Sequence, residues 1–484
     1  MSPRSLLRII IIDYTTERRL FQVILTQHFP HVPTFYGKTA QKTPFVHIVS
    51  IIICYDESKH SRRFDMEGIS LNLNVPRKDG FDLIVCGGGI AGCAAALEGA
   101  RLELKTLLLE KSCLLGGLAT TGLVNYFEPL CNGRGVQVLR GMAEEFLLLS
   151  IRYGYDTLPE IWRNGQPEQK TEARYQTQYD PYLFAMALCD LLADEGVKIL
   201  FDCIAAHPVM ENGVCLGVVT DSKSGFEFYP CRQLIDATGD AEMAAKAGMP
   251  TEDGKNYFSY FPRVLSLDSC REAAESGRID RAVRMTSGGA ANLYGGGQPE
   301  DVPFYYGASV ENTSDYLIRN QKIVLSRFKD GDRFSRMLVM TPMMPQFRCI
   351  RRIAGDYTLG EEDAYRHFPD SLCVINDFDR RDFLFEVPRA SMTRRGFSNI
   401  IAAGRCVSAE GYAWDVARVI PPAVMTGQAA AVLASRAIRE SRAVSDTDLA
   451  VLQSLLEERT VAVHFDDGLI PPDADTVPKH VHKL

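Results

Sequence analysis

Three glycines and one acid stand out by their types and their spacing. Gly87, Gly89 and Gly92 fill the glycine positions of the pattern G-x-G-x-x-G, and Glu110 follows further along the chain. In this pattern the first glycine permits a tight turn, the second lets the backbone approach a pyrophosphate, and the third lets a helix pack against a strand. A carboxylate at Glu110 would accept from a ribose 2′-hydroxyl and repel a 2′-phosphate, which argues against an NADP-type ligand.

The elements around these residues support the same interpretation. Residues 81–86 form an apolar run that predicts a strand, and residues 90–97 predict a helix directly after the glycine turn. Residues 105–110 predict a second strand that ends at the acid. The anion would lie on the unpaired N–H groups of the helix N-terminus. The alternative is an ordinary βαβ unit with a glycine-rich turn and a capping Glu110.

A second glycine-rich loop follows the acid within a few residues. It contains Lys111, Gly116, Gly117 and Thr120. Such a loop suits a second close approach of the backbone to an extended cofactor, because glycine adopts conformations closed to other residues. A plain surface loop is the alternative.

Further elements follow from periodicity and turn residues. Residues 135–150 and 181–195 predict amphipathic helices, and 197–201 a short strand. Residues 205–228 predict a meander of hairpins with a turn at 211–213, and 232–240 predict a strand that runs into a glycine turn. A capped helix is predicted at 449–457.

Length and composition limit the class of protein. A chain of 484 residues suggests two to four domains of about 100–200 residues each. The sequence is 46% hydrophobic and 24% charged, which is ordinary for a globular protein. A net charge of −8 gives no electrostatic basis for binding nucleic acid or an anionic membrane. A small molecule is the expected partner.

The first 74 residues differ from the rest. No signal-peptide core forms near the start, and the apolar run at 45–55 is too short to cross a bilayer. We therefore expect a cytoplasmic protein without a membrane partner. We hypothesise that residues 1–65 are an over-extended translation start and that the natural chain begins at Met66. The alternative is a small β-rich appendage.

The cysteines and histidines point away from a metal. The 13 cysteines form no C-x-x-C motif, so most are expected to be buried thiols in a reducing compartment. Cys113 and Cys131 are the two that lie in glycine-rich loops near the expected cofactor. Because neither metal-site spacing nor a four-cysteine cluster is present, no metal site and no iron–sulfur centre is predicted.

The order of these motifs resembles the FAD-dependent oxidoreductases of the glutathione-reductase-like fold. At the far end, residues 399–406 read as a strand and turn and 418–430 as a helix opened by prolines, like the C-terminal flavin motif of that group. Residues 351–357 and 386–389 resemble the family named FAD-dependent oxidoreductase, which is related to the flavoproteins of heterodisulfide reductase and of fumarate reductase. The resemblance covers about residues 79–460.

The resemblance implies FAD as cofactor and a set of binding residues. It places the glycines of the first turn at the pyrophosphate, Glu110 at the adenosine ribose, and the start of the C-terminal helix at the flavin pyrimidine edge, where a helix N-terminus stabilises the anionic reduced flavin. The implied cofactor residues are Gly87, Gly89, Gly92, Glu110, Lys111, Gly116, Gly117, Thr120, Thr238, Gly239, Gly404, Arg405, Met425, Gly427 and Gln428.

Candidate catalytic residues are Arg351, Arg352, Arg389 and Tyr412. In fumarate-reductase-like enzymes an arginine donates a proton and others bind carboxylates, which a guanidinium matches well. The alternative for Arg351 and Arg352 is a salt-bridged junction with Asp356 or another acid. Where family members often carry histidine, this chain has residues 410–414 (EGYAW), so Tyr412 or Glu410 would have to substitute.

The expected fold class is α/β, with a Rossmann-like FAD domain that is interrupted by an α+β cap over the substrate. We expect hydride transfer between the flavin N5 and a small organic substrate. The alternatives are an electron-transfer subunit with an iron–sulfur partner protein, and a flavoprotein whose FAD is structural or serves nucleic-acid modification. A single glycine fingerprint argues against a dedicated NAD domain. The expected division is an extension at 1–74, FAD domain at 79–250 and 385–460, cap at 251–384 and tail at 461–484.

Overall fold

The computed structural model describes residues 48–50, 72–380 and 382–472. The described residues belong to one compact unit. The hypothesis on residues 1–65 and much of the predicted tail at 461–484 therefore fall outside the described residues. Among the described residues, β1 (Ile48–Ser50) pairs antiparallel with β2 (Asn72–Asn74).

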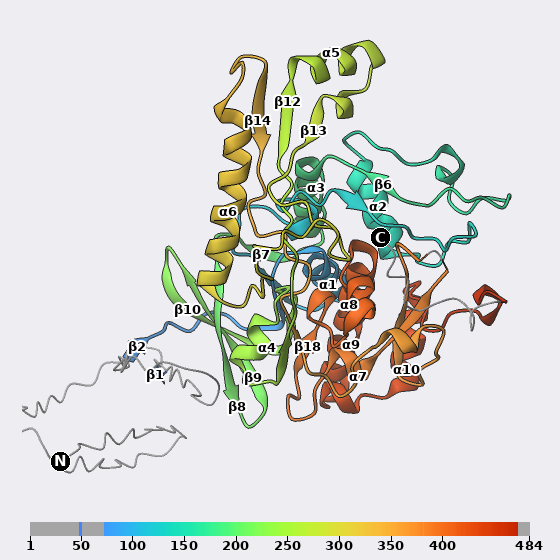
Figure 1. The fold of residues 1–484 in the computed structure, drawn as a ribbon. Helices are drawn as coiled ribbons and strands as arrows, with labels where there is room; N and C mark the ends of the chain where they lie inside the picture. Colours follow the sequence, from blue (N-terminus) through green and yellow to red (C-terminus); the bar gives the residue numbers. More distant parts are fainter. Residues whose placement is uncertain (1–47, 51–71, 381, 473–484) are drawn as a thin grey trace, which may run out of the picture. The chain divides into compact units, whose positions relative to one another are not determined.

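A seven-stranded sheet is the centre of the fold (Figure 1). Its strands are apolar and largely buried where they are parallel, as expected of a sheet covered on both faces. The order is β7-β4-β3-β10-β9-β8, and β18 also pairs with β10. The strands are β3 (Phe81–Cys86), β4 (Thr106–Leu109), β7 (Lys198–Leu200), β8 (Ile204–Glu211), β9 (Val214–Ser222), β10 (Gly225–Asp236) and β18 (Ile400–Ala402).

Strand β10 joins the two halves of this sheet. Its residues 225–230 pair antiparallel with β9, and residues 231–236 pair parallel with β3, with 234–236 also parallel to β18. The last strand of the predicted meander and the strand predicted at 232–240 are therefore one continuous strand, β10, which ends at Asp236. The α/β fold class is confirmed.

Helix α1 (Ile90–Arg101) packs closely on α9 (Ile420–Glu440). A Cβ on Gly427 would lie 2.2 Å from the carbonyl oxygen of Ala91, so only glycine permits this approach. Helix α3 (Pro181–Asp194) begins where predicted, because Asp180 accepts from two backbone N–H groups of its first turn.

Helix α2 (Met142–Ile151) is shorter than the helix predicted at 135–150. Gly135 and Gly141 have φ angles of 78° and 61°, which lie outside the right-handed helical region and end the helix pattern. The first half of the predicted helix is therefore a loop.

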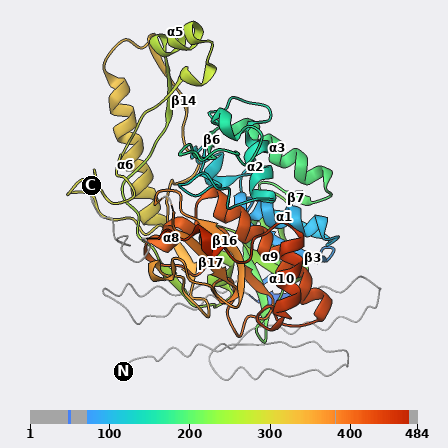
Figure 2. The same cartoon turned by 90° about the vertical axis from the view of Figure 1, so that its right-hand side faces the viewer.

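The segment between the two parts of the main sheet forms smaller units (Figures 1 and 2). One is an antiparallel sheet, ordered β13-β12-β14, which extends with α5 away from the main sheet in both views. Another is the pair β11–β15. A buried aromatic cluster of Phe258, Tyr305, Tyr316 and Phe347 packs this region. Bounds are β11 (Thr251–Asp253), β12 (Arg263–Ser266), α5 (Leu267–Ser276), β13 (Val283–Met285), α6 (Val310–Lys329), β14 (Arg336–Met340) and β15 (Arg351–Ile353).

A hairpin of β16 (Ser371–Asn376) and β17 (Leu384–Pro388) lies against α9. The boundary predicted between residues 384 and 385 falls inside this hairpin. The division into FAD domain and cap stays a prediction.

The remaining short elements connect these units. The strands and α-helices are β5 (Tyr126–Phe127), β6 (Thr177–Gln178), α4 (Glu242–Lys246), α7 (Arg389–Met392), α8 (Gly411–Ala417) and α10 (Leu449–Glu458). The 3-10 helices are η1 (Gly117–Ala119), η2 (Glu160–Trp162), η3 (Ile279–Arg281), η4 (Glu361–Asp363), η5 (Gly404–Cys406), η6 (Val444–Asp446) and η7 (Asp467–Leu469).

Among the described residues, no one helix has both the length and the apolar character to span a membrane. Helices α8 and α9, bent by 79° where they meet, satisfy that test only as a pair.

Candidate functional site

A cavity of about 540 Å³ lies at the carboxyl ends of the parallel strands. Each of β3, β4, β10 and β18 is followed by a loop that lines it. The lining residues are Gly87 and Gly89 to Ala91 after β3, Glu110 to Leu114 and Gly116 to Ala119 after β4, Ala237 to Gly239 after β10, and Ala403 to Arg405 after β18. Ligands of open α/β sheets bind at this edge, and the volume suits a cofactor or drug-sized molecule.

The three glycines of the first turn have distinct roles. Gly87 has a φ of 97°, and a Cβ there would lie 2.6 Å from the carbonyl oxygen of Ala237. A Cβ on Gly92 would lie 1.8 Å from the carbonyl oxygen of Gly87, so this glycine seats α1 on the turn and does not line the cavity. A Cβ on Gly89 would contact nothing within 4 Å, because it would project into the cavity.

Glu110 organises the loops at one end of the cavity. Its Oε2 accepts from the backbone N–H of Gly88 at 2.7 Å and its Oε1 from that of Ser112 at 2.7 Å. The side chain is buried but reaches the cavity. Its neighbour Lys111 also lines the cavity and lies 3.7 Å from Glu242.

The second glycine loop packs on the first. The N–H of Gly116 donates to the carbonyl of Gly88 at 2.8 Å, and a Cβ on Gly117 would lie 3.1 Å from the Cα of Gly89. Both glycines line the cavity, but Thr120 does not. Thr120 is fully buried and its hydroxyl donates to the carbonyl of Leu115 at 2.5 Å, so it supports the loop from behind.

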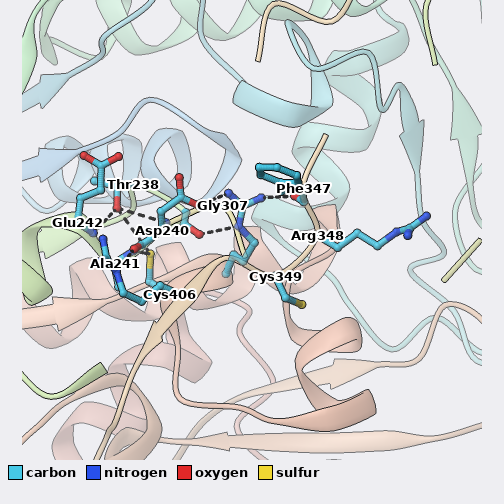
Figure 3. Close-up of polar contacts among 12 residues, drawn as sticks. Thr238, Asp240, Ala241, Glu242, Gly307, Phe347, Arg348, Cys349 and Cys406 are labelled. Carbon is cyan, nitrogen blue, oxygen red and sulfur yellow. Dashed lines mark hydrogen bonds and ion pairs between the residues drawn. The ribbon is translucent and has the colours of Figure 1, made fainter. Parts of the chain in front are cut away.

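Arg405 joins the loop after β10 to the loop after β18. Figure 3 shows Thr238, Asp240 and Phe347, which lie in this region. Its Nη2 lies 2.6 Å from Asp240 Oδ1, and its Nε and Nη1 donate to the carbonyls of Gly239 and Phe347 at 2.5 and 3.0 Å. The guanidinium is therefore held by protein groups on three sides. The hydroxyl of Thr238 accepts from the N–H of Glu242 at 3.0 Å.

The start of α9 reaches the cavity at residues other than those predicted. Ile420 and Ala423 of its first turn line the cavity, whereas Met425, Gly427 and Gln428 do not. The reason is that the helix begins at Ile420, which turns the later residues onto α1. The amide of Gln428 donates to Glu98 at 3.0 Å inside that packing. The cavity wall therefore does not support the assignment of these three residues to the flavin edge, which stays a prediction.

None of the four candidate catalytic residues lines the cavity. Arg351 donates to the carbonyl of Asp240 at 3.0 Å. Arg352 is buried and lies 3.6 Å from Glu410, which matches the alternative of a salt-bridged junction. Arg389 donates to the carbonyl of Thr447 at 2.9 Å.

Tyr412 is tied to a buried acid instead of the cavity. Its hydroxyl donates to Asp377 Oδ1 at 2.7 Å, and the guanidinium of Arg380 lies over its ring at 3.8 Å. Burial raises the pKa of the Tyr412 phenol far above its ordinary value and raises that of Asp377 to about 7. The Tyr412 hydroxyl therefore keeps its proton and is a poor proton donor.

The cavity wall also includes residues outside the predicted set of cofactor-binding residues. Met343 and Met344 come from the segment before β15, and the N–H of Met343 donates to the carbonyl of Thr121 at 2.9 Å. Arg418, which precedes α9 and pairs with Asp415 at 2.8 Å, also lines the wall. Its place just before the proline-opened helix was the available signal. Of the two cysteines singled out, Cys113 lines the cavity and Cys131 is buried.

These features fit FAD. The cavity at the strand ends is lined by glycine loops in which an added Cβ would clash, by a helix N-terminus and by an acid. Gly87, Gly89, Gly116, Gly117, Gly239 and Gly404 would lie along the diphosphate and its flanks, and the first turn of α9 would face the anionic part of the flavin. The fold and the site together define a flavoprotein with a Rossmann-like FAD domain.

Comparison with known proteins gives the family. The sequence model described as FAD dependent oxidoreductase matches residues 82–280 and 308–456. The chain belongs to this family of FAD-dependent oxidoreductases. The family resemblance, the enzyme class and the cofactor FAD that were predicted from the sequence are confirmed.

The individual proteins that the chain resembles are similar to it only distantly. The chain is 28% identical over 234 residues to the probable electron transfer flavoprotein-quinone oxidoreductase YgcN of Escherichia coli, a match that covers 47% of this chain and 51% of that protein. It is 29% identical over 175 residues to digeranylgeranylglycerophospholipid reductase 2 of Methanothermobacter thermautotrophicus, covering 35% and 43%. The matches thus span about half or less of these relatives' own length. A solved geranylgeranyl bacteriochlorophyll reductase-like protein of Thermoplasma acidophilum aligns at 15% identity and a TM-score of 0.39, covering 79% and 84%.

Proposed function

We propose that the protein transfers two electrons, as a hydride, between the flavin N5 and a small organic substrate. The observation that carries this proposal is the composition of the cavity wall. Met343 and Met344, from the region predicted as the cap, line the same cavity as the cofactor loops. Methionine provides an adaptable apolar surface, which suits a neutral or weakly polar organic molecule beside the flavin.

The chain's own groups would hold and insulate the cofactor. Bound FAD would supply the two-electron chemistry. The N-terminus of α9 carries a partial positive charge, which favours negative charge on a group held near it. The Met343 segment is fixed to the second glycine loop, since Gln346 also donates to the carbonyl of Gly122 at 2.7 Å. This wall would exclude water from the reacting atoms.

Arginine-assisted proton transfer is not part of the proposal. Arg351, Arg352 and Arg389 have protein acceptors and lie outside the cavity wall. Arg405 and Arg418 are the guanidinium groups in the wall, and both are paired with acids. We propose that these two position cofactor loops and that no carboxylate clamp is needed.

A second candidate is an electron-transfer flavoprotein that passes electrons to a partner protein. The similarity to the protein named probable electron transfer flavoprotein-quinone oxidoreductase favours it. Location in the cytoplasm, as expected from the sequence, would be compatible with either candidate.

The test is the visible spectrum of the purified, flavin-loaded protein under anaerobic conditions. It is recorded before and after mixing with single candidate alcohols, amines, carboxylates and NADH. Bleaching of the flavin band by one organic compound, with recovery of the matching oxidised product, is expected. If none of these compounds bleaches the flavin, while the chemically reduced protein passes its electrons to an oxidised iron–sulfur protein, hydride transfer is wrong and the electron-transfer role holds.

A further inference from the structure

Two histidines and a glutamate gather away from the cofactor cavity. His367 follows η4, Glu386 lies in β17, and His464 lies in the segment after α10. One potential ligand atom from each residue lies within 4.8 Å of the other two. None of the three residues lines the FAD cavity, so the proposed function gives them no role.

The glutamate is the centre of this cluster. Glu386 is fully buried, and its Oε1 lies 2.5 Å from His367 Nδ1 while its Oε2 lies 3.0 Å from His464 Nδ1. The backbone N–H of Phe368 donates to Oε2 at 2.7 Å and fixes the plane of the carboxylate. Both imidazoles thus turn the same ring nitrogen toward one carboxylate.

A further set of contacts orients His367. Its other ring nitrogen, Nε2, lies 2.8 Å from Asp467 Oδ1, and its ring stacks on Phe465 with a centroid distance of 4.2 Å. Histidines that bind metals commonly donate their second N–H to a carboxylate, which fixes the tautomer and makes the free nitrogen a better ligand. Asp467 is placed for that role, and it would leave the Nδ1 lone pair of His367 free to face Glu386.

We propose that His367, Glu386 and His464 bind one divalent transition-metal ion, with zinc as the expected occupant. Two imidazole nitrogens and one carboxylate are a ligand set that zinc and its neighbours accept. A tetrahedral zinc with bonds of about 2.0–2.1 Å separates its ligand atoms by roughly 3.3 Å. The histidine–glutamate contacts are shorter than this, so the two rings would move slightly outward as the ion replaces the hydrogen-bonding protons.

The position of the site suggests its consequence. The two histidine side chains are each 43% exposed, so the ion has access from solvent and room for a water ligand. The ion would fasten the segment after α10 to β17. Ser371 of the neighbouring strand β16 already donates to the carbonyl of Val463 in that segment at 2.6 Å. We assign the ion a structural role: it would hold the last described segment of the chain against β17.

Sequence spacing could not reveal this site. Glu386 is 19 positions from His367 and 78 from His464, so no short metal motif exists. The prediction that the chain has no metal site rested on such motifs alone.

The test is zinc binding to the flavin-loaded, chelator-treated protein without an affinity tag. Isothermal titration calorimetry with zinc chloride measures affinity, and elemental analysis after dialysis measures stoichiometry. We expect one strongly bound zinc per chain in the wild type and a loss of affinity of at least tenfold in His367→Gln and in His464→Gln. Asp467→Asn should weaken binding by about 10–100-fold, as for other residues that orient a metal ligand.

Matched controls make the outcome decisive. His207→Gln changes a histidine of β8 outside the cluster and should bind zinc like the wild type. X-ray absorption of the bound zinc should show only nitrogen and oxygen neighbours at about 2.0–2.1 Å. Flavin content and circular dichroism confirm that each variant is folded. Zinc binding that is absent in the wild type, or that is unchanged in both cluster histidine variants, would overturn the proposal, whatever the outcome for the flavin.

Discussion

Gly89 is the residue at which cofactor binding can be separated from folding. Its backbone has a φ of −67°, which any residue adopts, and a side chain there would meet only the cavity. We expect Gly89→Val to fold like the wild type but to lose FAD, because its methyl groups occupy the place of the pyrophosphate. Flavin absorbance per mole of protein, together with circular dichroism, measures this.

Two other glycines provide the comparison. Gly80→Ala adds a methyl group that would make only ordinary contacts with Pro230, outside the cavity, and should retain FAD. Gly92→Ala should unfold the protein or prevent its expression, since its Cβ would collide with the carbonyl of Gly87. Retention of FAD by Gly89→Val would contradict the placement of the pyrophosphate at this turn.

Asp240 should contribute strongly to stability through Arg405. The two side chains are 19% and 10% exposed, and the pair lies at 2.6 Å. Asp240→Ala should lower the free energy of unfolding by about 1.5–3 kcal/mol, the range for a hydrogen bond to a charged group. The control Asp268→Ala breaks the exposed pair with Arg271 and should cost about 1 kcal/mol or less. Urea unfolding measures both, and equal losses would be inconsistent with the proposed role of the pair.

Residues of local motifs were predictable from sequence, and residues of distant packing were not. The first glycine turn and Glu110 lie in one βαβ unit, so their spacing alone locates them. Gln428 was assigned to the flavin because it follows a familiar motif, yet it faces Glu98 of α1. Which face of a helix meets the cofactor depends on its partner helix, which one sequence does not show.

At the scale of elements, the start of α9 depends on a buried acid. Glu128 Oε2 accepts from the N–H of Ile420 at 3.2 Å, and burial raises the pKa of Glu128 from 4.5 to about 7. A group whose pKa is raised in the folded state contributes stability below its unfolded pKa, and that contribution is lost as pH rises through the folded value. Glu128 should therefore make the protein less stable as the pH increases from about 4.5 to 7.

The variant Glu128→Gln tests this dependence. Glutamine keeps a carbonyl oxygen for the N–H of Ile420 but cannot titrate. We expect its free energy of unfolding to fall less between pH 5 and pH 7 than that of the wild type, measured by urea unfolding at both values. Asp377, whose pKa is also raised to about 7 by burial, adds the same trend to both proteins. Identical slopes for the two proteins would show that Glu128 is ionised at both pH values.

Element prediction succeeded where periodicity and end signals agreed. Helix α3 begins after Asp180 and α10 after Asp448, and both aspartates accept N–H groups of the first turn. The helix predicted from 135 begins at Met142, because apolar periodicity continued through two glycines that have positive φ. Periodicity reports which residues are buried, and it does not by itself report the backbone conformation.

At the scale of the molecule, FAD should stabilise the entire unit. The cavity wall includes loops from β3, β4, β10 and β18 and the start of α9, so unfolding any of them releases the cofactor. Free FAD at about 100 times its Kd should add roughly 2.7 kcal/mol. Scanning calorimetry should show a higher Tm for the wild type with FAD, and no change for Gly89→Val. A wild-type Tm that does not change when FAD is added would contradict the cavity as the FAD-binding site.

The cofactor half of the molecule was readable from the sequence, and the middle was not. The βαβ unit, the meander and the C-terminal strand and helix each carry local signals. The region between β11 and β15 has its aromatic residues in a buried cluster, as in any small core, so their types did not reveal the topology. Arg351 and Arg352 were candidates because they are neighbours in sequence, but strand β15 directs them to Asp240 and Glu410.

The pairing of β18 with β10 also bears on the order of events during synthesis. Strands β3, β4 and β10 leave the ribosome long before β18 and α9, which supply the last wall of the cavity. A nascent chain that ends before residue 423 can form the first glycine turn but cannot enclose a flavin. Since domains usually fold as their segments emerge, cofactor capture would come only after β18 and α9 have emerged. Until then, β10 would lack its pairing with β18 at one edge of the parallel part of the sheet.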